Sequence, residues 1–206
     1  MQPLPIDPRV VVVGTSAVGK TTFARALATA LQVPFVELDE LHWSPGWREK
    51  SRSEFSRLVA EAAAGSVWVA DGNYRTVRDI LWPRANLVVW LNYGFALTLW
   101  RGFRRSVQRC FSGEVLWHGN RESLHRVFLS RESILVWIIT THKRRRRQFS
   151  ELRASAKYPN VVWVEFREPS EAQTWLAEVG CAASHQTGSA ADGDGEIAKA
   201  TATRRG

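Results

Sequence analysis

The sequence predicts an α/β fold in which helices cover both faces of a five-stranded parallel sheet. Two observations lead to this prediction. Short, uninterrupted apolar runs alternate with helical patterns, which is typical of strands that are buried on both faces. A glycine-rich turn joins the first apolar run to the first helical pattern, as in folds that are built from successive strand–helix units.

Five runs have the composition of buried strands, because they are short, apolar and rich in β-branched or aromatic residues. In chain order they are Arg9–Val13, Pro34–Leu38, Val67–Ala70, Asn86–Leu91 and Asn160–Phe166. Four other segments are predicted to be helical from their composition or their amphipathic spacing. They are Ala24–Leu31, Ser53–Ala64, Phe95–Arg109 and Ser170–Val179.

Composition limits the kind of protein. The chain has 206 residues, 45% of them hydrophobic, which is enough for one domain with a substantial core. A formal net charge of +8 favours anionic partners such as nucleotides, nucleic acid or an acidic membrane surface. Two isolated cysteines form neither a disulfide framework nor a metal-binding pattern. We expect a cytoplasmic protein without a membrane anchor, because no signal-peptide pattern is present and the apolar run Ile134–Ile139 is too short to span a bilayer.

The glycine-rich turn fits the pattern G-x-x-x-x-G-K-[ST] through Gly14, Gly19, Lys20 and Thr21. Such a loop curls so that backbone N–H groups point at phosphate oxygens, and the N-terminus of the next helix adds partial positive charge. Lys20 is expected to neutralise the β- and γ-phosphates, and the Thr21 hydroxyl to ligate Mg²⁺. The sequence therefore predicts a P-loop that binds ATP and Mg²⁺. Its predicted nucleotide-binding residues are Gly14, Thr15, Ser16, Ala17, Val18, Gly19, Lys20, Thr21 and Thr22.

Two aspartates follow predicted strands and should lie at the same edge of the sheet as the P-loop. Ligands of open parallel sheets bind beyond the carboxyl ends of the strands. Asp71 follows a mostly apolar strand, as does the Mg²⁺-organising carboxylate of P-loop NTPases. Asp39 suits an acceptor-side group, either a hydroxyl-binding carboxylate or a general base. A helix cap or an ordinary loop position is the alternative for each.

The order of these features resembles the adenylate-kinase-like P-loop small-molecule kinases. The string DGNYR (Asp71–Arg75) resembles the Asp-Gly-Phe-Pro-Arg string of adenylate kinases, which implies that Arg75 holds a phosphate or another acidic group of the acceptor. Together with LDELHWSPGW (Leu38–Trp47) and WHGNRES (Trp117–Ser123), it resembles the bacterial topology-modulation proteins, an adenylate-kinase-related group, more closely still. The resemblance covers about residues 9–180 and implies ATP-dependent phosphate transfer to a small molecule.

One departure from adenylate kinases leaves the acceptor open. Adenylate kinases carry Thr-Gly-Asp/Glu-x-x-Arg after the second strand, where this chain has Leu-Asp-Glu-Leu-His-Trp. Both a nucleoside monophosphate and a hydroxyl-bearing acceptor, as in shikimate- and gluconate-type kinases, therefore stay open. Trp43 and Trp47 flank a Ser-Pro-Gly turn. They form either an aromatic wall for the acceptor or a hydrophobic staple that docks the next helix. His42 is either a proton carrier or a structural residue. The expected acceptor-binding residues are Asp39, His42, Trp43, Trp47, Gly72, Asn73, Arg75 and Arg121.

The predicted helix Phe95–Arg109 has an apolar side and a basic side. The apolar side consists of Ala96, Leu99, Phe103, Val107 and Cys110, and opposite them lie Arg101, Arg105 and Arg109. The resemblance implies that Arg101 and Arg105 clamp the transferring phosphoryl group; the alternative is a solvated basic side. The predicted catalytic residues are therefore Lys20, Asp39, Arg101 and Arg105.

These features predict a P-loop kinase domain over residues 1–181, with an acceptor insert at about residues 40–66. A short lid at about residues 110–120 would exclude water, and Asn120 would cap the helix that follows it. Residues 182–206 are rich in small and polar residues, and we expect a disordered tail there.

The basic run Lys143–Arg147 has two interpretations. It is either a solvated helix end or a nucleic-acid-binding patch. The second interpretation supports an alternative function, a nucleotide-regulated, nucleic-acid-associated ATPase that affects DNA topology, and a plain ATPase is a third possibility. The guanine-binding string of GTPases and the signature of ABC-type transporters are both missing from the sequence. A monomer and a homodimer are both compatible with the sequence.

Overall fold

The computed structural model describes residues 4–112, 115–120, 134–155 and 157–183. Its main sheet consists of five parallel strands in the order β2-β5-β1-β6-β7, which confirms the predicted fold class. The strands are β1 (Arg9–Gly14), β2 (Phe35–Glu37), β5 (Trp68–Asp71), β6 (Leu87–Leu91) and β7 (Val162–Phe166). Each lies within one residue or two of a predicted strand.

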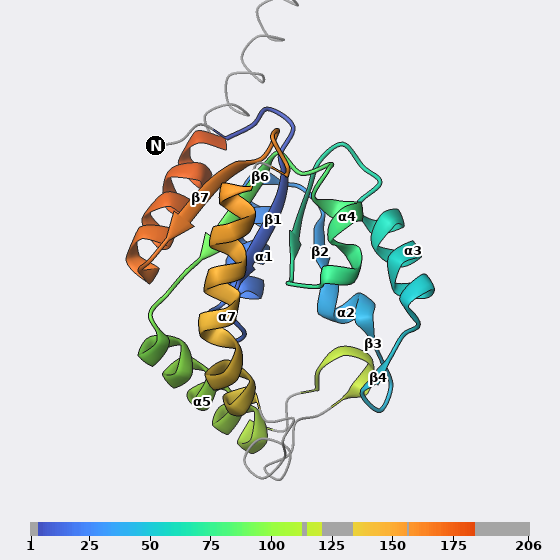
Figure 1. The fold of residues 1–206 in the computed structure, drawn as a ribbon, viewed down its shortest axis with the longest axis vertical. Helices are drawn as coiled ribbons and strands as arrows, with labels where there is room; N and C mark the ends of the chain where they lie inside the picture. The colour runs from blue at the N-terminus through green and yellow to red at the C-terminus, as the bar shows by residue number, and fades with distance from the viewer. Residues whose placement is uncertain (1–3, 113–114, 121–133, 156, 184–206) are drawn as a thin grey trace, which may run out of the picture.

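Helices cover both faces of this sheet (Figure 1). The larger ones are α1 (Lys20–Leu31), α3 (Arg52–Ala62), α5 (Phe95–Ser112), α7 (Ile134–Ala154) and a helix over residues 169–183. None of the helices among the described residues is both long and apolar enough to cross a membrane.

The central strand β1 separates two hydrophobic cores, because successive strand residues point to opposite faces. Val10 and Val12 are fully buried in one core, which contains residues of α1 and of the helix over residues 169–183. Val11 and Val13 are buried in the other core, where Phe149 of α7 packs. This burial fixes β1 at the centre of the sheet, and the P-loop begins where β1 ends.

Short elements form the region between β2 and α3. Helix α2 (Leu38–His42) follows β2 directly, and β3 (Trp43–Ser44) pairs antiparallel with β4 (Arg48–Glu49). The predicted Ser-Pro-Gly turn joins these two strands, with Gly46 at φ 74° and Trp47 at φ 58°. After β5, the chain forms a 3-10 turn, η1 (Arg75–Val77), and then α4 (Arg78–Leu81).

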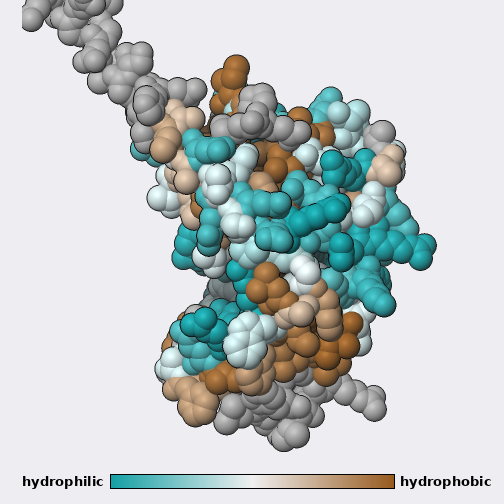
Figure 2. Space-filling model, turned by 90° about the vertical axis from the view of Figure 1, so that its left-hand side faces the viewer, coloured by the Kyte–Doolittle hydropathy of each residue, from teal (hydrophilic) through white to brown (hydrophobic). Residues whose placement is uncertain are grey.

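The residues that helix α5 buries differ from those that its sequence pattern predicts. Its buried residues are Thr98, Gly102 and Ser106, rather than members of the predicted apolar side. A Cβ atom at Gly102 would lie 2.5 Å from Cδ1 of Ile138, so the missing side chain lets α7 approach α5 closely. Phe103 of the apolar side is 40% exposed, and it stacks on Trp100, which is 60% exposed. Figure 2 shows hydrophobic surface gathered in the lower part of the molecule, the part that contains α5 in Figure 1.

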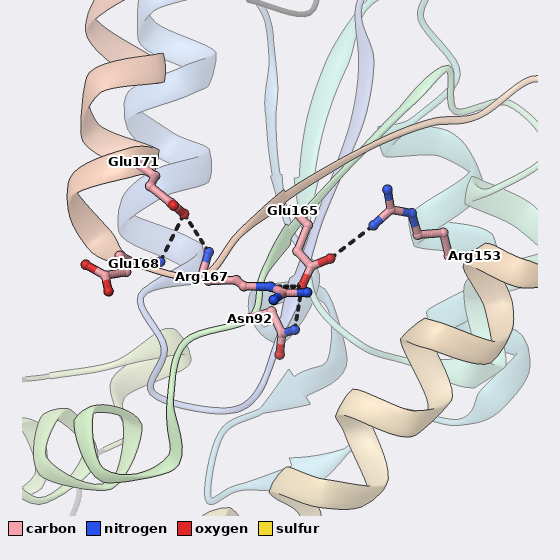
Figure 3. Close-up of polar contacts among 6 residues, drawn as sticks. All are labelled: Asn92, Arg153, Glu165, Arg167, Glu168 and Glu171. Carbon is pink, nitrogen blue, oxygen red and sulfur yellow. Dashed lines mark hydrogen bonds and ion pairs between the residues drawn. The ribbon is translucent and has the colours of Figure 1, made fainter.

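A polar network ties the edge of the sheet to two helices (Figure 3). On β7, Glu165 accepts hydrogen bonds from Asn92 at 2.7 Å, Arg153 of α7 at 3.0 Å and Arg167 at 3.1 Å. Glu171 accepts hydrogen bonds from the backbone N–H groups of residues 167 and 168, at the start of the last helix. These contacts hold α7 against β7, and α7 also lines the cleft described below.

Candidate active site

The loop after β1 has the backbone shape that a phosphate cradle requires. Gly14 has φ 152°, Ala17 has φ 64° and Gly19 has φ 104°. A Cβ atom at Gly14 would lie 2.5 Å from the carbonyl oxygen of Leu91, so only glycine fits there. Asn73 braces the same residue, because its side chain accepts a hydrogen bond from the Gly14 N–H at 3.3 Å and donates one to the Gly14 carbonyl. We predicted Asn73 on the acceptor side, and the structure shows its amide bound to the P-loop.

Lys20 is the first residue of α1 and faces the cleft beyond the sheet. Its Nζ donates a hydrogen bond to the Thr15 carbonyl at 3.2 Å, within the same loop. Desolvation lowers the pKa of Lys20, while the nearby charges of Asp71 and Asp39 act in the opposite direction. The ammonium group is therefore held beside the curled backbone, where a phosphate would replace its carbonyl partner.

Thr21 and Asp71 lie together at the same place. The Thr21 hydroxyl donates to Oδ2 of Asp71 at 2.5 Å, and the register of β5 puts Asp71 beside Val12 of β1 and Glu37 of β2. Asp71 is 3% exposed, and burial raises its pKa to about 6, against the opposing effects of the Thr21 hydrogen bond and the charge of Lys20. This hydroxyl–carboxylate pair could supply two oxygens to Mg²⁺, which usually keeps water and phosphate oxygens as its other ligands.

No group of three or more Asp, Glu, His or Cys side chains among the described residues could hold a metal ion by itself. A metal that arrives with a nucleotide fits the Thr21–Asp71 pair, since the phosphates provide the missing ligands.

Asp39 lies on α2, two residues after β2. Its Oδ1 accepts a hydrogen bond from the Tyr74 hydroxyl at 2.6 Å. The Tyr74 ring packs against His42 at 4.6 Å and edge-on against Phe55 at 5.1 Å between ring centroids. Burial and the negative charge of Asp39 raise the pKa of Tyr74 above its usual range, so the phenol stays protonated and donates. Sequence analysis missed Tyr74, although it belongs to the quoted string DGNYR.

Three tryptophans form a wall of the cleft. Trp47 packs edge-on against Trp43 at 5.6 Å and against Trp117 at 6.3 Å between ring centroids. Trp117 also donates a hydrogen bond from Nε1 to Glu37 Oε1 at 3.0 Å. Trp117 and Glu37 were not among the predicted site residues, although Trp117 begins the quoted string WHGNRES. Their contact becomes visible only when the chain brings residues 37 and 117 together.

Asn120 fastens the β3–β4 hairpin to this wall. Its Oδ1 accepts from the Trp47 N–H at 3.0 Å, and its Nδ2 donates to the Ser44 carbonyl at 3.1 Å. We expected Asn120 to cap a following helix, but both polar atoms of its side chain bind the hairpin instead. The remaining predicted residue of this region, Arg121, lies outside the described residues.

His42 is part of the packing around Tyr74. Its ring makes edge-on contacts with Trp43 and Phe55, each at 4.9 Å between centroids. Nε2 lies 3.7 Å from Glu49 Oε1, and the buried Nδ1 has no hydrogen-bond partner among the described residues. These contacts favour the structural interpretation of His42, with one edge of the ring lining the cleft.

The predicted arginines of α5 separate into two positions. Arg101 donates to the Val18 carbonyl at 2.9 Å and lies over the Tyr93 ring at 5.3 Å, so it braces the P-loop. Arg105 and Arg109 line the cleft, and Arg101 does not. Arg75 lines the cleft from the opposite side, next to Tyr74. Arg105 is therefore placed to act on a bound group directly, whereas Arg101 acts through the loop.

The basic run of α7 faces the cleft, which neither of our interpretations predicted. Lys143, Arg144, Arg145 and Arg147 all belong to the cleft lining. Desolvation lowers the pKa of Arg145, and the charges of Arg144, Arg78 and Arg75 act in the same direction. Four cations of this run therefore add to the positive field around the P-loop rather than to a separate surface.

Most of these groups line one open cleft of about 2210 Å³, whereas Asp71, Arg101 and Asn120 lie behind its lining residues. Single small-molecule sites usually occupy about 300–1,000 Å³. The cleft has room for a nucleotide on the P-loop and a second molecule against the tryptophan wall. Most of the predicted acceptor residues line the same cleft as the predicted nucleotide residues. They are Asp39, His42, Trp43, Trp47, Gly72 and Arg75.

One family profile matches the part of the chain that contains the P-loop. The profile of the ATPase family associated with various cellular activities (AAA) matches residues 10–73, less than half of the chain. Among curated proteins, none matches the chain significantly.

Solved structures of small-molecule kinases align with most of this chain, each with a TM-score below 0.5. A gluconokinase from Sinorhizobium meliloti has a TM-score of 0.46 and 21% identity, with 87% of this chain and 97% of that chain covered. A shikimate kinase from Bacteroides thetaiotaomicron has a TM-score of 0.45 and 16% identity, with 84% and 96% covered. A sugar kinase from a Janibacter species has a TM-score of 0.41 and 22% identity, with 85% and 95% covered.

Proposed function

We propose that this chain is an ATP-dependent phosphotransferase that moves the γ-phosphate of ATP to a small-molecule acceptor. The observation that carries the proposal is the single cleft, in which a P-loop with Lys20 faces a second binding wall of different chemistry. A plain ATPase needs only water as its second reactant and has no use for that wall. The described residues fit ATP, because the loop shape, Lys20 and the Thr21–Asp71 pair match a magnesium-bound triphosphate.

Each group on the nucleotide side has a role in this proposal. Backbone N–H groups of the P-loop and Lys20 hold the phosphates, and Arg101 keeps the loop in shape through the Val18 carbonyl. Arg105 stabilises negative charge on the transferring group, with Arg109 beside it in the lining. Mg²⁺, when bound at Thr21 and Asp71, would neutralise charge on the β- and γ-phosphates.

On the other side, the tryptophan wall and Arg75 bind the acceptor. Trp43 and Trp47 offer flat apolar faces for a ring, and Arg75 offers a donor for an acidic substituent. The carbonyl of Arg75 accepts a hydrogen bond at the end of η1, but its guanidinium has no hydrogen-bond or ion-pair partner among the described residues and is available to a ligand. The likeness to adenylate-kinase-related topology-modulation proteins belongs to this proposal as well, and a nucleoside monophosphate is one acceptor that it allows. A cytoplasmic monomer or homodimer remains our expectation.

The test is transfer of labelled γ-phosphate from ATP into a small-molecule cell extract, with Lys20→Ala as the control. We expect a labelled small molecule with the intact protein only, and its mass identifies the acceptor. Release of label as inorganic phosphate alone, unchanged by the extract, would overturn the proposal in favour of a plain ATPase.

The nucleic-acid alternative rests on the exposed cations of α7. Lys143, Arg144 and Arg147 are exposed, although they line the nucleotide cleft. A nucleotide-regulated protein that affects DNA topology would bind duplex DNA with an affinity that falls steeply with salt, whether or not an acceptor is present. Measuring DNA binding between about 50 and 200 mM salt, with and without ATP, separates this function from the kinase.

A further inference from the structure

We infer that the acceptor attacks through a neutral hydroxyl group, that Asp39 takes up the hydroxyl proton, and that Tyr74 is the residue that positions Asp39. This inference rests on the proposed phosphotransferase function and narrows its substrate class from any small molecule to an alcohol. It also adds Tyr74 to the residues on which the reaction depends.

The geometry of Asp39 is that of a fixed carboxylate with one oxygen left over. Tyr74 donates to Oδ1 at 2.6 Å, and Oδ2 has no hydrogen bond to any described residue. Tyr74 itself cannot swing away, because its ring is enclosed by His42 and Phe55. The carboxylate is therefore oriented by a neutral donor, and its second oxygen is available to a hydroxyl in the cleft.

The Tyr74–Asp39 hydrogen bond joins two separate segments of the chain. Asp39 belongs to α2, which follows β2, and Tyr74 lies three residues after the end of β5. Strands β2 and β5 are neighbours in the sheet, with Glu37 in register with Asp71. The bond thus sets the distance between the acceptor segment and the strand that carries the Mg²⁺-organising carboxylate.

The local charges favour a neutral nucleophile. Glu37, Asp39 and Asp71 lie near one another at the ends of β2 and β5. Burial raises the pKa values of Glu37 and Asp71, and the negative charge of Asp39 acts in the same direction on both. Glu37 is paired with Arg25 at 2.9 Å, and Asp71 is bound by Thr21, but the only described hydrogen bond to the Asp39 carboxylate comes from an uncharged phenol. An attacking phosphate oxygen would meet this carboxylate with like charge, whereas a hydroxyl donates to it.

The chemical step balances without any further reactant. The acceptor oxygen forms a bond to the γ-phosphorus while the bond from that phosphorus to the β,γ-bridging oxygen breaks, and ADP leaves. Oδ2 of Asp39 takes the hydroxyl proton, and Lys20 is close enough to Asp39 for their charges to interact. The products are a phosphate monoester and ADP.

Arg75 supports the competing interpretation that the acceptor attacks through a phosphate oxygen. It lines the same cleft one residue after Tyr74 and could hold a phosphate as the attacking group. On the present inference it binds an acidic substituent of the acceptor away from the attacking oxygen. The two interpretations differ in the bond that is formed, a C–O–P ester or a P–O–P anhydride, and that difference can be measured without knowing the acceptor.

The first experiment therefore determines the chemistry of the labelled product. The protein is incubated with ATP and the small-molecule extract, and the product is analysed by ³¹P NMR and by its stability in hot dilute acid. We expect a monoester signal and an acid-stable product. An anhydride signal with an acid-labile product would overturn this inference and leave the phosphotransferase intact, whereas no product at all would overturn both.

The second experiment tests Tyr74 in the same transfer assay. Tyr74→Phe keeps the ring contacts and removes only the hydroxyl, and Tyr158→Phe is the matched control, because its hydroxyl also binds an aspartate, Asp79 at 3.1 Å, but outside the cleft. We expect Tyr74→Phe to lower kcat about tenfold with an unchanged KM for ATP, and Tyr158→Phe to change neither.

Combining Tyr74→Phe with Asp39→Asn separates a positioning role of Tyr74 from a general loss of structure. Asp39→Asn alone should lower kcat about 10²- to 10⁴-fold, and adding Tyr74→Phe to it should cause no further loss, because Tyr74 acts through Asp39. An equal tenfold loss in both backgrounds, or a loss as large in Tyr158→Phe, would overturn the role of Tyr74.

Discussion

The two walls of the cleft are built in different ways. The phosphate wall comes from one continuous stretch after β1 together with Asp71 at the end of the neighbouring strand, so its parts are set by the parallel sheet. The acceptor wall combines α2, a hairpin of two-residue strands and residues 117–120. They are joined by hydrogen bonds between residues more than 70 positions apart, each of which involves at least one side chain. Backbone register fixes the first wall, and individual side chains fix the second.

This difference separates the two parts of the proposed function. Val10–Val13 are almost completely buried, and changes there would disturb the whole domain. The hairpin depends on Asn120 and on edge-on tryptophan contacts, which could change with little effect on the sheet. A constant phosphate wall beside an adjustable acceptor wall would allow one scaffold to serve different acceptors. The predictions below test whether the two walls act separately.

The largest effect should come from Lys20→Ala. Phosphate transfer should fall about 10³-fold or more, because the cation that faces the phosphates is lost from a cleft of low dielectric. The melting temperature without nucleotide should hold or rise, since Lys20 is desolvated and its side chain bonds only the Thr15 carbonyl. Transfer assays and thermal melts check both parts, and retained transfer would show that the phosphate wall works without its lysine.

Asp71→Asn should lose activity and gain stability. Transfer should fall about 10²- to 10³-fold, because a carboxylate that organises Mg²⁺ becomes an amide. The folded pKa of about 6 exceeds the ordinary value of 3.8, so the folded protein binds this proton more tightly than the unfolded chain does. Asp71 therefore stabilises the fold least above pH 6, and its contribution to stability falls as the pH rises from about 4 to about 6.

Urea unfolding of the nucleotide-free protein in EDTA checks the direction of this pH dependence of stability. At pH 7 the Asp71→Asn protein should be more stable than the unsubstituted protein, by at most about 3 kcal/mol, and the difference should shrink towards pH 4. A stability difference that is equal at both pH values would show that the carboxylate is not desolvated in solution.

Arg105→Ala and Arg101→Ala should change different kinetic parameters, kcat in the first case and the KM for ATP in the second. Arg105 lines the cleft, so its loss should lower kcat about 10²-fold with little change in the KM for ATP. Arg101 holds the P-loop through the Val18 carbonyl, so its loss should raise the KM for ATP about tenfold. Steady-state kinetics with varied ATP check the pair, and equal effects on both parameters would contradict the separation.

The phosphate wall was largely predictable from the sequence because its information is local. The glycines, Lys20 and Thr21 lie within the single stretch Gly14–Thr21, and a strand-ending aspartate such as Asp71 is visible as a change from apolar to polar residues. The five strands were predicted within a residue or two for the same reason, since buried parallel strands read as uninterrupted apolar runs.

The acceptor wall was only partly predictable because its contacts are distant in sequence. Trp43 and Trp47 were identified from the turn between them, but their contacts with Trp117 and Asn120 leave no local trace. The packing of α5 was missed because a glycine, rather than the apolar side, decides where α7 approaches. The basic run of α7 was interpreted as a solvated helix end or a nucleic-acid-binding patch, because nothing in the sequence shows that this helix borders the cleft.

The smallest effect should come from Asn120→Ala, which tests the acceptor wall alone. Both polar atoms of this 4% exposed side chain bind the hairpin, so its loss should reduce the free energy of unfolding by about 1–3 kcal/mol. Because the hairpin carries Trp43 and Trp47, the amount of extract that gives half-maximal transfer should rise several-fold, while the KM for ATP stays unchanged.

A matched control is Asn86→Ala. Asn86 also bonds two backbone groups, the Arg9 N–H at 2.9 Å and the Asp7 carbonyl at 2.7 Å, but it lies away from the cleft. It should lose comparable stability without any change in the requirement for acceptor. If both substitutions raise the acceptor requirement equally, general loosening of the fold explains the effect; if only Asn120→Ala does, the acceptor wall is an independent unit that one distant amide holds in place.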